Sequence, residues 1–183
     1  LDALRPSGFR DVLVVVGYKG ELVRSYFGDG SALGLRIEYV VQRKPSGTAE
    51  ATELAEGFVG DDDFLMVYGD LLIARSAVSS VLDGYRRFGS PLLSVVPVEH
   101  PERYGVVKVE DGLVKDLIEK PRGGETASNT INAGIYVFNS EIFRLARRTP
   151  ISPRKELELT DTIKLLLEAG ERVAAQPVDP NDW

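Results

Sequence analysis

Strand-length apolar runs alternate with helix-length segments over the first hundred residues, and this order constrains the fold more than any other feature. The runs are rich in apolar and β-branched residues, which predicts strands at residues 11–16, 36–41, 64–68 and 92–98. The segments between them predict helices at residues 21–27, 48–58 and 77–88. The run at residues 11–16 is continuous, as in a strand buried on both faces of a parallel sheet. The first half therefore predicts a parallel sheet with helices on both faces.

After residue 98 the pattern changes to antiparallel pairing. Asp111-Gly112 separates apolar runs at residues 104–109 and 113–119, which predicts a hairpin. A strand at 131–138, helices at 140–148 and 158–169, and a last strand at 172–178 follow. We expect one α/β domain over residues 1–183: a Rossmann-like, mixed but mostly parallel sheet flanked by helices, with an antiparallel insertion that caps a cleft. The polar loop at residues 121–128 is the segment expected to move most.

Charge and composition exclude several classes of function. The net charge is −6 and the longest Lys/Arg clusters are dipeptides, so no basic face for nucleic acid is expected. No apolar run approaches the roughly 20 residues that span a bilayer, and the first residues lack the apolar core of a signal peptide. We therefore expect a soluble, cytoplasmic protein that binds neither nucleic acid nor membrane. Because cysteine is absent and His100 is the single histidine, chemistry must rest on carboxylates, lysines, backbone amides or a bound metal.

Two candidate sites lie where strands of the first half end. Asp70 follows Val67-Tyr68-Gly69 at the carboxyl edge of the predicted sheet, where open α/β sheets bind ligands. A carboxylate there is a natural ligand for a hard cation, or it caps the next turn. Gln42 precedes a Pro/Gly loop that opens into a helix at Thr48. Helix N-terminal amides favour anions and a side-chain amide can read the edge of a base, although Thr48 as an ordinary helix N-cap is the alternative.

Two more candidates lie in the second half. Glu119 and Lys120 end the second hairpin strand, where Glu can accept from sugar hydroxyls and Lys can neutralise a phosphate. The alternative is a surface ion pair before a loop. Asn132 and Gly134 lie inside a predicted strand, where glycine marks either close approach of a ligand or a β-bulge. A buried Asn132 needs a hydrogen-bond partner, and a sugar hydroxyl is one possibility.

The order and spacing of these motifs resemble the sugar-1-phosphate nucleotidylyltransferases over essentially the whole chain. Within that family, the Gly-Thr-Ala loop and the Glu-Leu-Thr-Asp element look most like archaeal bifunctional enzymes, which carry an N-terminal nucleotidylyltransferase domain and a C-terminal acetyltransferase domain. Glucose-1-phosphate thymidylyltransferases are the next match. The matching stretches are Val15-Val16-Gly17-Tyr18-Lys19-Gly20-Glu21, Gln42 with Gly47-Thr48-Ala49-Glu50-Ala51, Tyr68-Gly69-Asp70, Tyr104-Gly105-Val106-Val107, Glu119-Lys120-Pro121, Asn132-Ala133-Gly134-Ile135-Tyr136 and Glu158-Leu159-Thr160-Asp161.

The resemblance implies an activity and a role for each matched residue. The implied reaction transfers a nucleotidyl group from UTP or dTTP to a sugar 1-phosphate, giving an NDP-sugar and pyrophosphate. Asp70 would hold Mg²⁺ and, with Lys120, would form the catalytic pair. The residues implied to bind the nucleotide are Gln42, Gly47, Thr48 and Tyr68, and those implied to bind the sugar phosphate are Gly105, Glu119, Lys120 and Asn132.

The resemblance also implies parts of the enzyme that lie outside this sequence. The family's first strand and Gly-rich phosphate loop would precede Leu1, and a second metal-binding Asp would follow Trp183. We therefore expect little turnover from the 183 residues alone, and an open sheet edge that favours a homo-oligomer. The alternative is a non-catalytic regulatory or assembly subunit of the same fold. Retention of Asp70, Lys120 and Gln42 together argues against that alternative.

Overall fold

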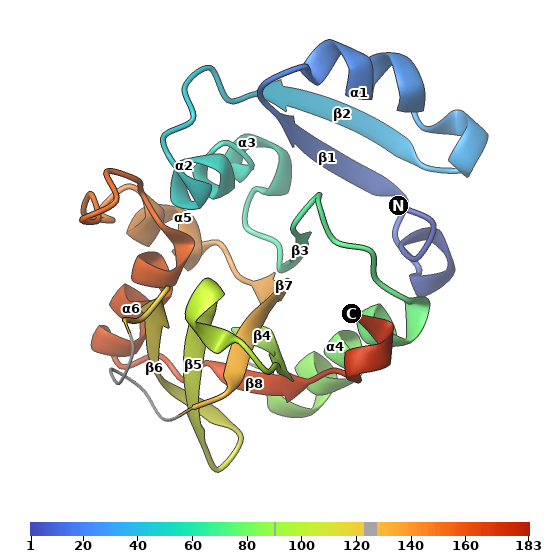
Figure 1. Cartoon of the computed structure of the whole chain (residues 1–183). Coiled ribbons are helices and arrows are strands. Elements are labelled where there is room, and N and C mark those ends of the chain that lie inside the picture. Colours follow the sequence, from blue (N-terminus) through green and yellow to red (C-terminus); the bar gives the residue numbers. More distant parts are fainter. Residues whose placement is uncertain (90, 123–127) are drawn as a thin grey trace.

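A computed structural model describes residues 1–89, 91–122 and 128–183, so most of the loop predicted at 121–128 lies outside the described residues. Its strands form two sheets (Figure 1). Two strands form a parallel pair: β1 (Asp11–Val16) and β2 (Arg36–Val41). Six strands form the second sheet in the order β3-β7-β4-β8-β6-β5. Their bounds are β3 (Phe64–Val67), β4 (Leu92–Pro97), β5 (Gly105–Glu110), β6 (Leu113–Glu119), β7 (Thr130–Phe138) and β8 (Ala174–Pro177).

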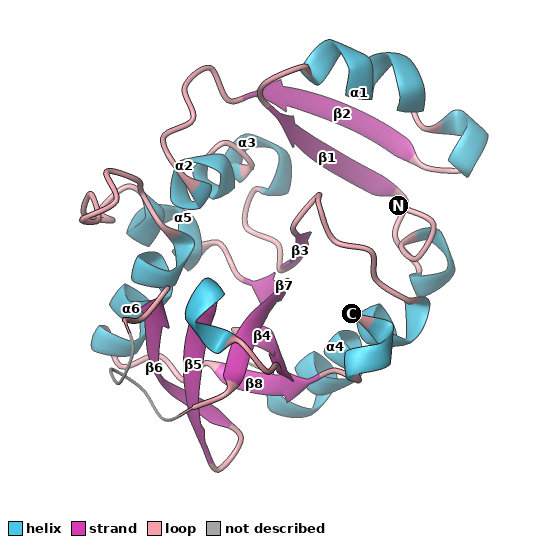
Figure 2. Ribbon diagram, viewed as in Figure 1, coloured by secondary structure: helices cyan, strands magenta, loops and turns pink. Residues whose placement is uncertain are grey.

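Helices flank the strands, as Figure 2 shows, and the predicted α/β class with a mixed sheet is confirmed. The longest helix, α4, has 14 residues, and no helix in the described part of the chain is long and apolar enough to cross a bilayer. The predicted helix at residues 48–58 is split into two short helices, α2 and α3. The bounds are α1 (Gly20–Phe27), α2 (Thr48–Glu53), α3 (Glu56–Val59), α4 (Arg75–Phe88), α5 (Glu141–Ala146) and α6 (Leu159–Glu168).

The strand pairing differs from the continuous parallel half that the sequence suggested. Within the described residues, parallel pairing is confined to β1–β2 and β4–β8. Strand β7 lies between β3 and β4 and runs antiparallel to both. Almost all of its nine residues are buried. A long apolar strand buries the most apolar surface in the middle of a sheet, and this burial stabilises the fold. Strand β7 therefore occupies a central position that the sequence order would have given to a strand of the first half.

Side chains of the six-stranded sheet alternate between two cores. Tyr136 and Phe138 of β7 pack in the core that contains α5 and α6 side chains. Ile135 and Val137 point to the other face and pack in the core that contains α4 side chains such as Val81. The sheet is therefore held from both faces, and β7 contributes to each core.

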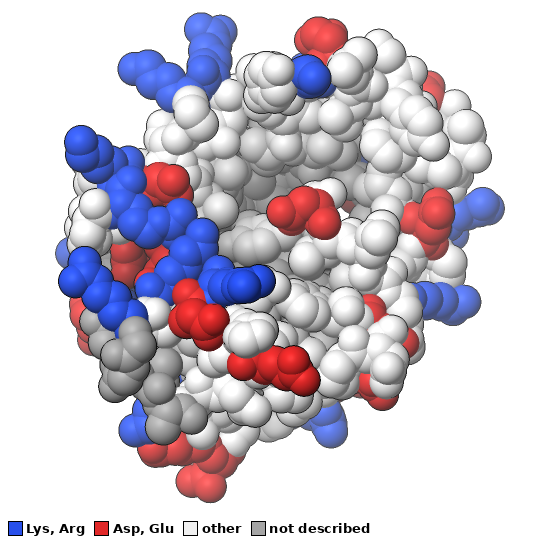
Figure 3. Space-filling model, viewed as in Figure 1, with Lys and Arg blue, Asp and Glu red and all other residues white. Residues whose placement is uncertain are grey.

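Strand β1 is less buried than its apolar sequence suggested. Val16 is buried, whereas residues 12–15 are half-buried, so the prediction of a strand covered on both faces is wrong. The reason is that β1 pairs only with β2, and β3 pairs only with β7, among the residues that the structure describes. Figure 1 shows the β1–β2 ribbon standing apart from β3, and Figure 3 shows the surface hollowed on that side of the molecule.

We expect the chain to self-associate, because unpaired strand edges and half-buried apolar side chains recruit another strand. Val16 contacts the start of α1 at Gly20, so Leu13 lies on the opposite face of β1. Leu13→Lys should therefore shift sedimentation profiles towards monomer, whereas Ser76→Lys, on the exposed start of α4, should leave them unchanged. A wild-type chain that stays monomeric at all concentrations and melts cooperatively would contradict this expectation.

Candidate functional site

The loop after β2 and the start of α2 bring three predicted site residues together. The Gln42 side-chain amide donates to the Gly47 carbonyl at 3.0 Å and to Glu50 Oε2 at 2.8 Å, so it is held across the loop. Thr48 is the first residue of α2, and its Oγ1 accepts from the Leu159 amide at 2.9 Å. Thr48 thus ties α2 to α6. The alternative of an ordinary N-cap is wrong, because Gly47 occupies that position.

Gly47 occupies a position that no other residue fits. Its φ is +128°, and an added Cβ would lie 2.2 Å from the Leu157 carbonyl oxygen. The two segments are joined by backbone hydrogen bonds, from the Leu157 amide to the Ser46 carbonyl at 2.7 Å and from the Ala49 amide to the Leu157 carbonyl at 2.9 Å. The loop is therefore fastened to the segment that precedes α6.

Tyr68 and Asp70 lie just beyond β3. The backbone amide of Tyr68 donates to the Gly134 carbonyl at 3.0 Å, which extends the pairing with β7. Burial raises the pKa of the Tyr68 hydroxyl, and the negative charges of Glu119 and Asp70 add to the rise. Glu119 and Asp70 thus both influence the same hydroxyl. Asp70 itself is exposed.

Three residues predicted to bind the sugar phosphate meet at one end of the hairpin. Gly105 of β5 pairs directly with Glu119 of β6. A Cβ on Gly105 would lie 2.9 Å from Glu119 Oε2, 3.0 Å from Thr160 Cγ2 and 3.8 Å from Asn132 Cβ. The missing side chain of Gly105 leaves room between a carboxylate and an amide. The structure thus brings Gly105, Glu119 and Asn132 together, and their roles in binding stay predictions.

Glu119 lies in a partly desolvated, charged setting. Thr160 Oγ1 donates to its Oε2 at 3.3 Å, and Arg154 Nη1 lies 3.3 Å from its Oε1. Burial raises the pKa of Glu119 and the charge of Glu158 raises it further, while Thr160, Arg154 and Lys120 act in the opposite direction. Glu158 is only 5% exposed, and its Oε2 has no hydrogen-bond partner among the described residues.

Lys120 follows the end of β6 and has no close carboxylate among the residues that the structure describes. Its φ is +45°, and its backbone amide donates to the Tyr104 carbonyl at 2.9 Å. In the described part of the chain no carboxylate oxygen lies within 4.0 Å of its ammonium. The alternative of a Glu119–Lys120 surface ion pair is therefore wrong, since Arg154 pairs with Glu119 instead.

Arg154 is the residue of this site that sequence reasoning missed. It lies between α5 and α6, and its guanidinium is 3.3 Å from Glu119, 3.7 Å from Glu156 and 3.7 Å from Glu158. Its one signal in the sequence is that it comes shortly before the Glu158-Leu159-Thr160-Asp161 stretch. A single arginine in a loop does not stand out from surface arginines until the fold brings it to Glu119.

Asn132 is already paired within the protein. Its Nδ2 donates to the Tyr136 hydroxyl at 2.6 Å and its Oδ1 accepts from the Gly134 amide at 3.1 Å, so pairing does not require a sugar hydroxyl. Gly134 has a φ of +77° beside a register shift between β4 and β7, which confirms the β-bulge alternative. The groups that closely approach Gly134 are Leu71 Cδ1 and the Tyr68 ring, each 2.9 Å from the position of an added Cβ.

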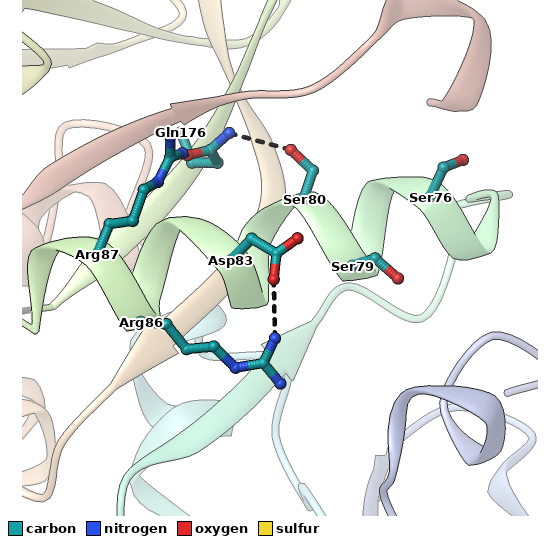
Figure 4. Close-up of a pocket in the computed structure, with 7 residues that line it drawn as sticks. All are labelled: Ser76, Ser79, Ser80, Asp83, Arg86, Arg87 and Gln176. Atoms are coloured by element: carbon teal, nitrogen blue, oxygen red, sulfur yellow. Dashed lines mark hydrogen bonds and ion pairs between the residues drawn. The ribbon is translucent and has the colours of Figure 1, made fainter.

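A hollow on the exposed face of α4 lies outside this site (Figure 4). It contains none of the predicted site residues. Its two arginines are engaged, Arg86 with Asp83 at 2.8 Å and Arg87 with the Gln176 amide oxygen at 2.9 Å. The lining residues are Ser76, Ser79, Ser80, Asp83, Arg86, Arg87 and Gln176. The hollow therefore lies where α4 packs against β8.

Comparison with known proteins agrees with the resemblance noted in the sequence. The family model described as nucleotidyl transferase matches residues 1–183. The low-salt glycan biosynthesis nucleotidyltransferase Agl11 of Haloferax volcanii is 37% identical over 183 residues, which are 98% of this chain and 50% of that protein. Glucose-1-phosphate thymidylyltransferase of Streptomyces griseus is 34% identical over 174 residues, covering 94% of this chain and 48% of that protein. The chain thus spans about half the length of these relatives.

Solved structures share the fold. A putative glucose-1-phosphate thymidylyltransferase from Bacillus anthracis in complex with sucrose superposes with a TM-score of 0.83 at 28% identity, covering 97% of this chain and 72% of that one. A UDP-glucose pyrophosphorylase complexed with UDP-glucose gives a TM-score of 0.81, covering 96% of this chain and 75% of that one. That second pair is only 20% identical, so it shows the fold alone.

Gly47→Ala should destabilise the chain by about 1–3 kcal/mol, because it combines an unfavourable φ with a clash against the Leu157 carbonyl. Gly57→Ala is the matched control, since Gly57 is helical and an added Cβ meets nothing within 4 Å. Urea unfolding measures both variants. A Gly47→Ala variant as stable as Gly57→Ala would show that the loop is not clamped against Leu157.

The stability of the Glu119→Gln variant relative to wild type should increase as the pH rises from about 4 to 7. The pKa of Glu119 is raised in the folded state, so the folded protein binds more protons there and ionisation lowers stability as the pH rises. Glu110→Gln is the control with the opposite expected trend. Lys108 lowers the pKa of Glu110, so the stability that this carboxylate contributes is lost as the pH falls. Urea unfolding of Glu119→Gln and Glu110→Gln at both pH values tests the contrast, and trends of the same sign would contradict it.

Proposed function

This chain belongs to the nucleotidyl transferase family, and we propose that it forms the substrate-binding part of an enzyme that transfers a nucleotidyl group from UTP or dTTP to a sugar 1-phosphate. The observation that carries the proposal is the meeting of two residue groups at Tyr68. Thr48 lowers the pKa of the Tyr68 hydroxyl, while the charges of Glu119 and Asp70 raise the pKa of the same group. A nucleotide pocket and a sugar pocket would thus adjoin, as a transfer between two ligands requires.

The nucleotide is assigned to the loop between β2 and α2. Gln42 would read the base, while Gly47 and Thr48 would line the pocket and Tyr68 would close its inner end. The hydrogen bonds from Gln42 to Gly47 and Glu50 support this assignment, because they hold the amide in one orientation before a ligand arrives.

The sugar 1-phosphate is assigned to the end of the hairpin and the bulge of β7. Glu119 and Asn132 would hydrogen-bond the sugar hydroxyls in the space that Gly105 leaves. Lys120 would hold the phosphate as a point charge. The absence of a close carboxylate at Lys120 within the described residues supports the last assignment, since no ion pair with those residues neutralises its ammonium.

The reaction needs charge neutralisation and alignment more than covalent help from the protein. An oxygen of the sugar 1-phosphate attacks the α-phosphorus of the nucleotide, a new P–O bond forms, and the bond to pyrophosphate breaks. Lys120 would neutralise and orient the attacking phosphate. No step requires a cysteine or histidine nucleophile, in agreement with the composition.

Asp70 is better suited to be a single protein ligand of Mg²⁺ than to be one of several protein side chains that enclose a metal ion. No group of three or more acidic or histidine side chains that could hold a metal exists among the described residues. Mg²⁺ commonly binds one or two carboxylates and completes its shell with water and substrate phosphates, which suits one exposed Asp70. Mg²⁺ held there would neutralise phosphate charge. We further propose that the protein is cytoplasmic, because nucleoside triphosphates are available there. We also propose that it is a homo-oligomer, in which a second copy can cover the unpaired strand edges.

Isothermal titration with Mg²⁺, UTP or dTTP, and glucose 1-phosphate tests the proposal. Lys120→Met should weaken glucose 1-phosphate binding by roughly 10- to 100-fold, as expected for loss of a hydrogen bond to a charged group. Lys108→Met is the matched control, because that ammonium is paired with Glu110 at 3.0 Å on the exposed side of the hairpin. Asp70→Asn should weaken nucleotide binding only when Mg²⁺ is present.

Three outcomes of these measurements are informative. Binding of a nucleotide without any binding of sugar 1-phosphate would overturn the transferase proposal in favour of a nucleotide-binding domain. Binding of neither would favour a regulatory or assembly subunit. Pyrophosphate release by these 183 residues at an ordinary enzymatic rate would contradict the expectation that the chain alone turns over little.

A further inference from the structure

The side chains of Tyr68, Tyr136 and Asn132 lie in a row beside the β7 bulge. Tyr136 is fully buried and lies opposite Met66 of β3 and Leu93 of β4. Its hydroxyl accepts from Asn132 Nδ2 at 2.6 Å, which leaves its own proton for another acceptor. Tyr68 lies beside it: the two rings meet edge to face at 5.5 Å between centroids, and Tyr136 lowers the pKa of the Tyr68 hydroxyl as a hydrogen-bonding neighbour would.

The row reaches the nucleotide loop at one end and the sugar cluster at the other. Thr48 lowers the pKa of the Tyr68 hydroxyl as well, and its Oγ1 accepts from the Leu159 amide at 2.9 Å. At the far end, the Gly134 amide donates to Asn132 Oδ1 at 3.1 Å and so fixes which way the amide is turned. The residues assigned to the two ligands are therefore joined through groups that are mostly out of solvent.

Packing alone does not explain the hydroxyl of Tyr136. Its ring stacks on Phe138 at 5.2 Å between centroids and lies in an apolar core, where a phenylalanine would serve. A buried hydroxyl is unfavourable unless it is paired, so its presence points to the groups it pairs. Burial also raises the pKa of Tyr136 well above its ordinary value, so the hydroxyl keeps its proton and stays a donor.

Building on the proposed function, we infer that Tyr136 is a positioning residue that holds the Asn132 amide for the sugar 1-phosphate and couples it through Tyr68 to the nucleotide loop. Tyr136 touches neither ligand in this scheme. After bonding to Tyr136 and Gly134, the Asn132 amide retains one N–H and one lone pair, which suffice for a sugar hydroxyl. Nucleotide bound at Thr48 then favours the arrangement of Tyr68 and Tyr136 that presents this amide, so each ligand strengthens binding of the other.

Tyr136→Phe removes the hydroxyl and keeps the ring, and isothermal titration with glucose 1-phosphate measures the effect. The dissociation constant should rise by roughly 2- to 10-fold, the range for one lost hydrogen bond. Affinity for UTP or dTTP alone should be unchanged, while the factor by which nucleotide strengthens sugar-phosphate binding should fall towards one. Tyr39→Phe is the control, because its hydroxyl bonds the Gly28 carbonyl at 2.8 Å on an exposed part of the ribbon.

A cycle with Asn132→Ala separates positioning from general stability. If Tyr136 acts through Asn132, Tyr136→Phe should have no further effect on glucose 1-phosphate affinity in the Asn132→Ala background, whereas independent effects would add. Tyr68→Phe breaks the row from the other side, and it should likewise lower the coupling between ligands, which keeps the test decisive if Tyr136→Phe folds poorly. Wild type that binds both ligands, with unchanged affinity and coupling in these variants, overturns this inference alone. Wild type that binds neither ligand overturns the proposed function as well.

Discussion

The insertion of β7 between β3 and β4 is the interaction on which the rest of the structure depends. This strand supplies Ile135 and Val137 to the core under α4, and Tyr136 and Phe138 to the core under α5 and α6. Without it neither face of the sheet could be closed, because β3 has no other strand partner among the described residues. The bulge at Gly134 is part of the same interaction, since it admits the Tyr68 ring and turns Asn132 towards the hairpin.

The candidate site combines polar groups that would be costly if they were not arranged together. Glu119 and Glu158 are both largely withdrawn from water, and Arg154 lies close to each of them. A cation between two carboxylates offsets their repulsion, while the partnerless Oε2 of Glu158 remains an acceptor without a donor in the described part of the chain. Such an arrangement of buried charges lowers stability, and arrangements of this kind are typical of functional sites.

Strand positions could be predicted from the sequence far better than strand partners. The apolar runs at residues 64–68 and 92–98 correspond closely to β3 and β4, because local composition decides which segments extend. Their order in the sheet depends on pairing with β7, which is distant in the chain, and no local pattern encodes that pairing. The motifs around Gln42, Glu119 and Asn132 likewise predict where a site would form, and that prediction concerns function rather than fold. Their actual partners, such as Leu157 beside Gly47 and Arg154 beside Glu119, are distant in the chain and become visible only in three dimensions.

The contact of Gly47 with Leu157 has a consequence for how the protein is made. One partner belongs to the first third of the chain and the other to the last, so the loop must remain unfastened on the ribosome until the final third has been synthesised. Bringing Gly47 and Leu157 together also costs the conformational entropy of the long segment between them, and this cost precedes the stabilising contacts. The step is therefore expected late in folding. A newly made chain therefore passes through a stage in which residues 1–156 have been synthesised but the loop around Gly47 is not yet fixed in place.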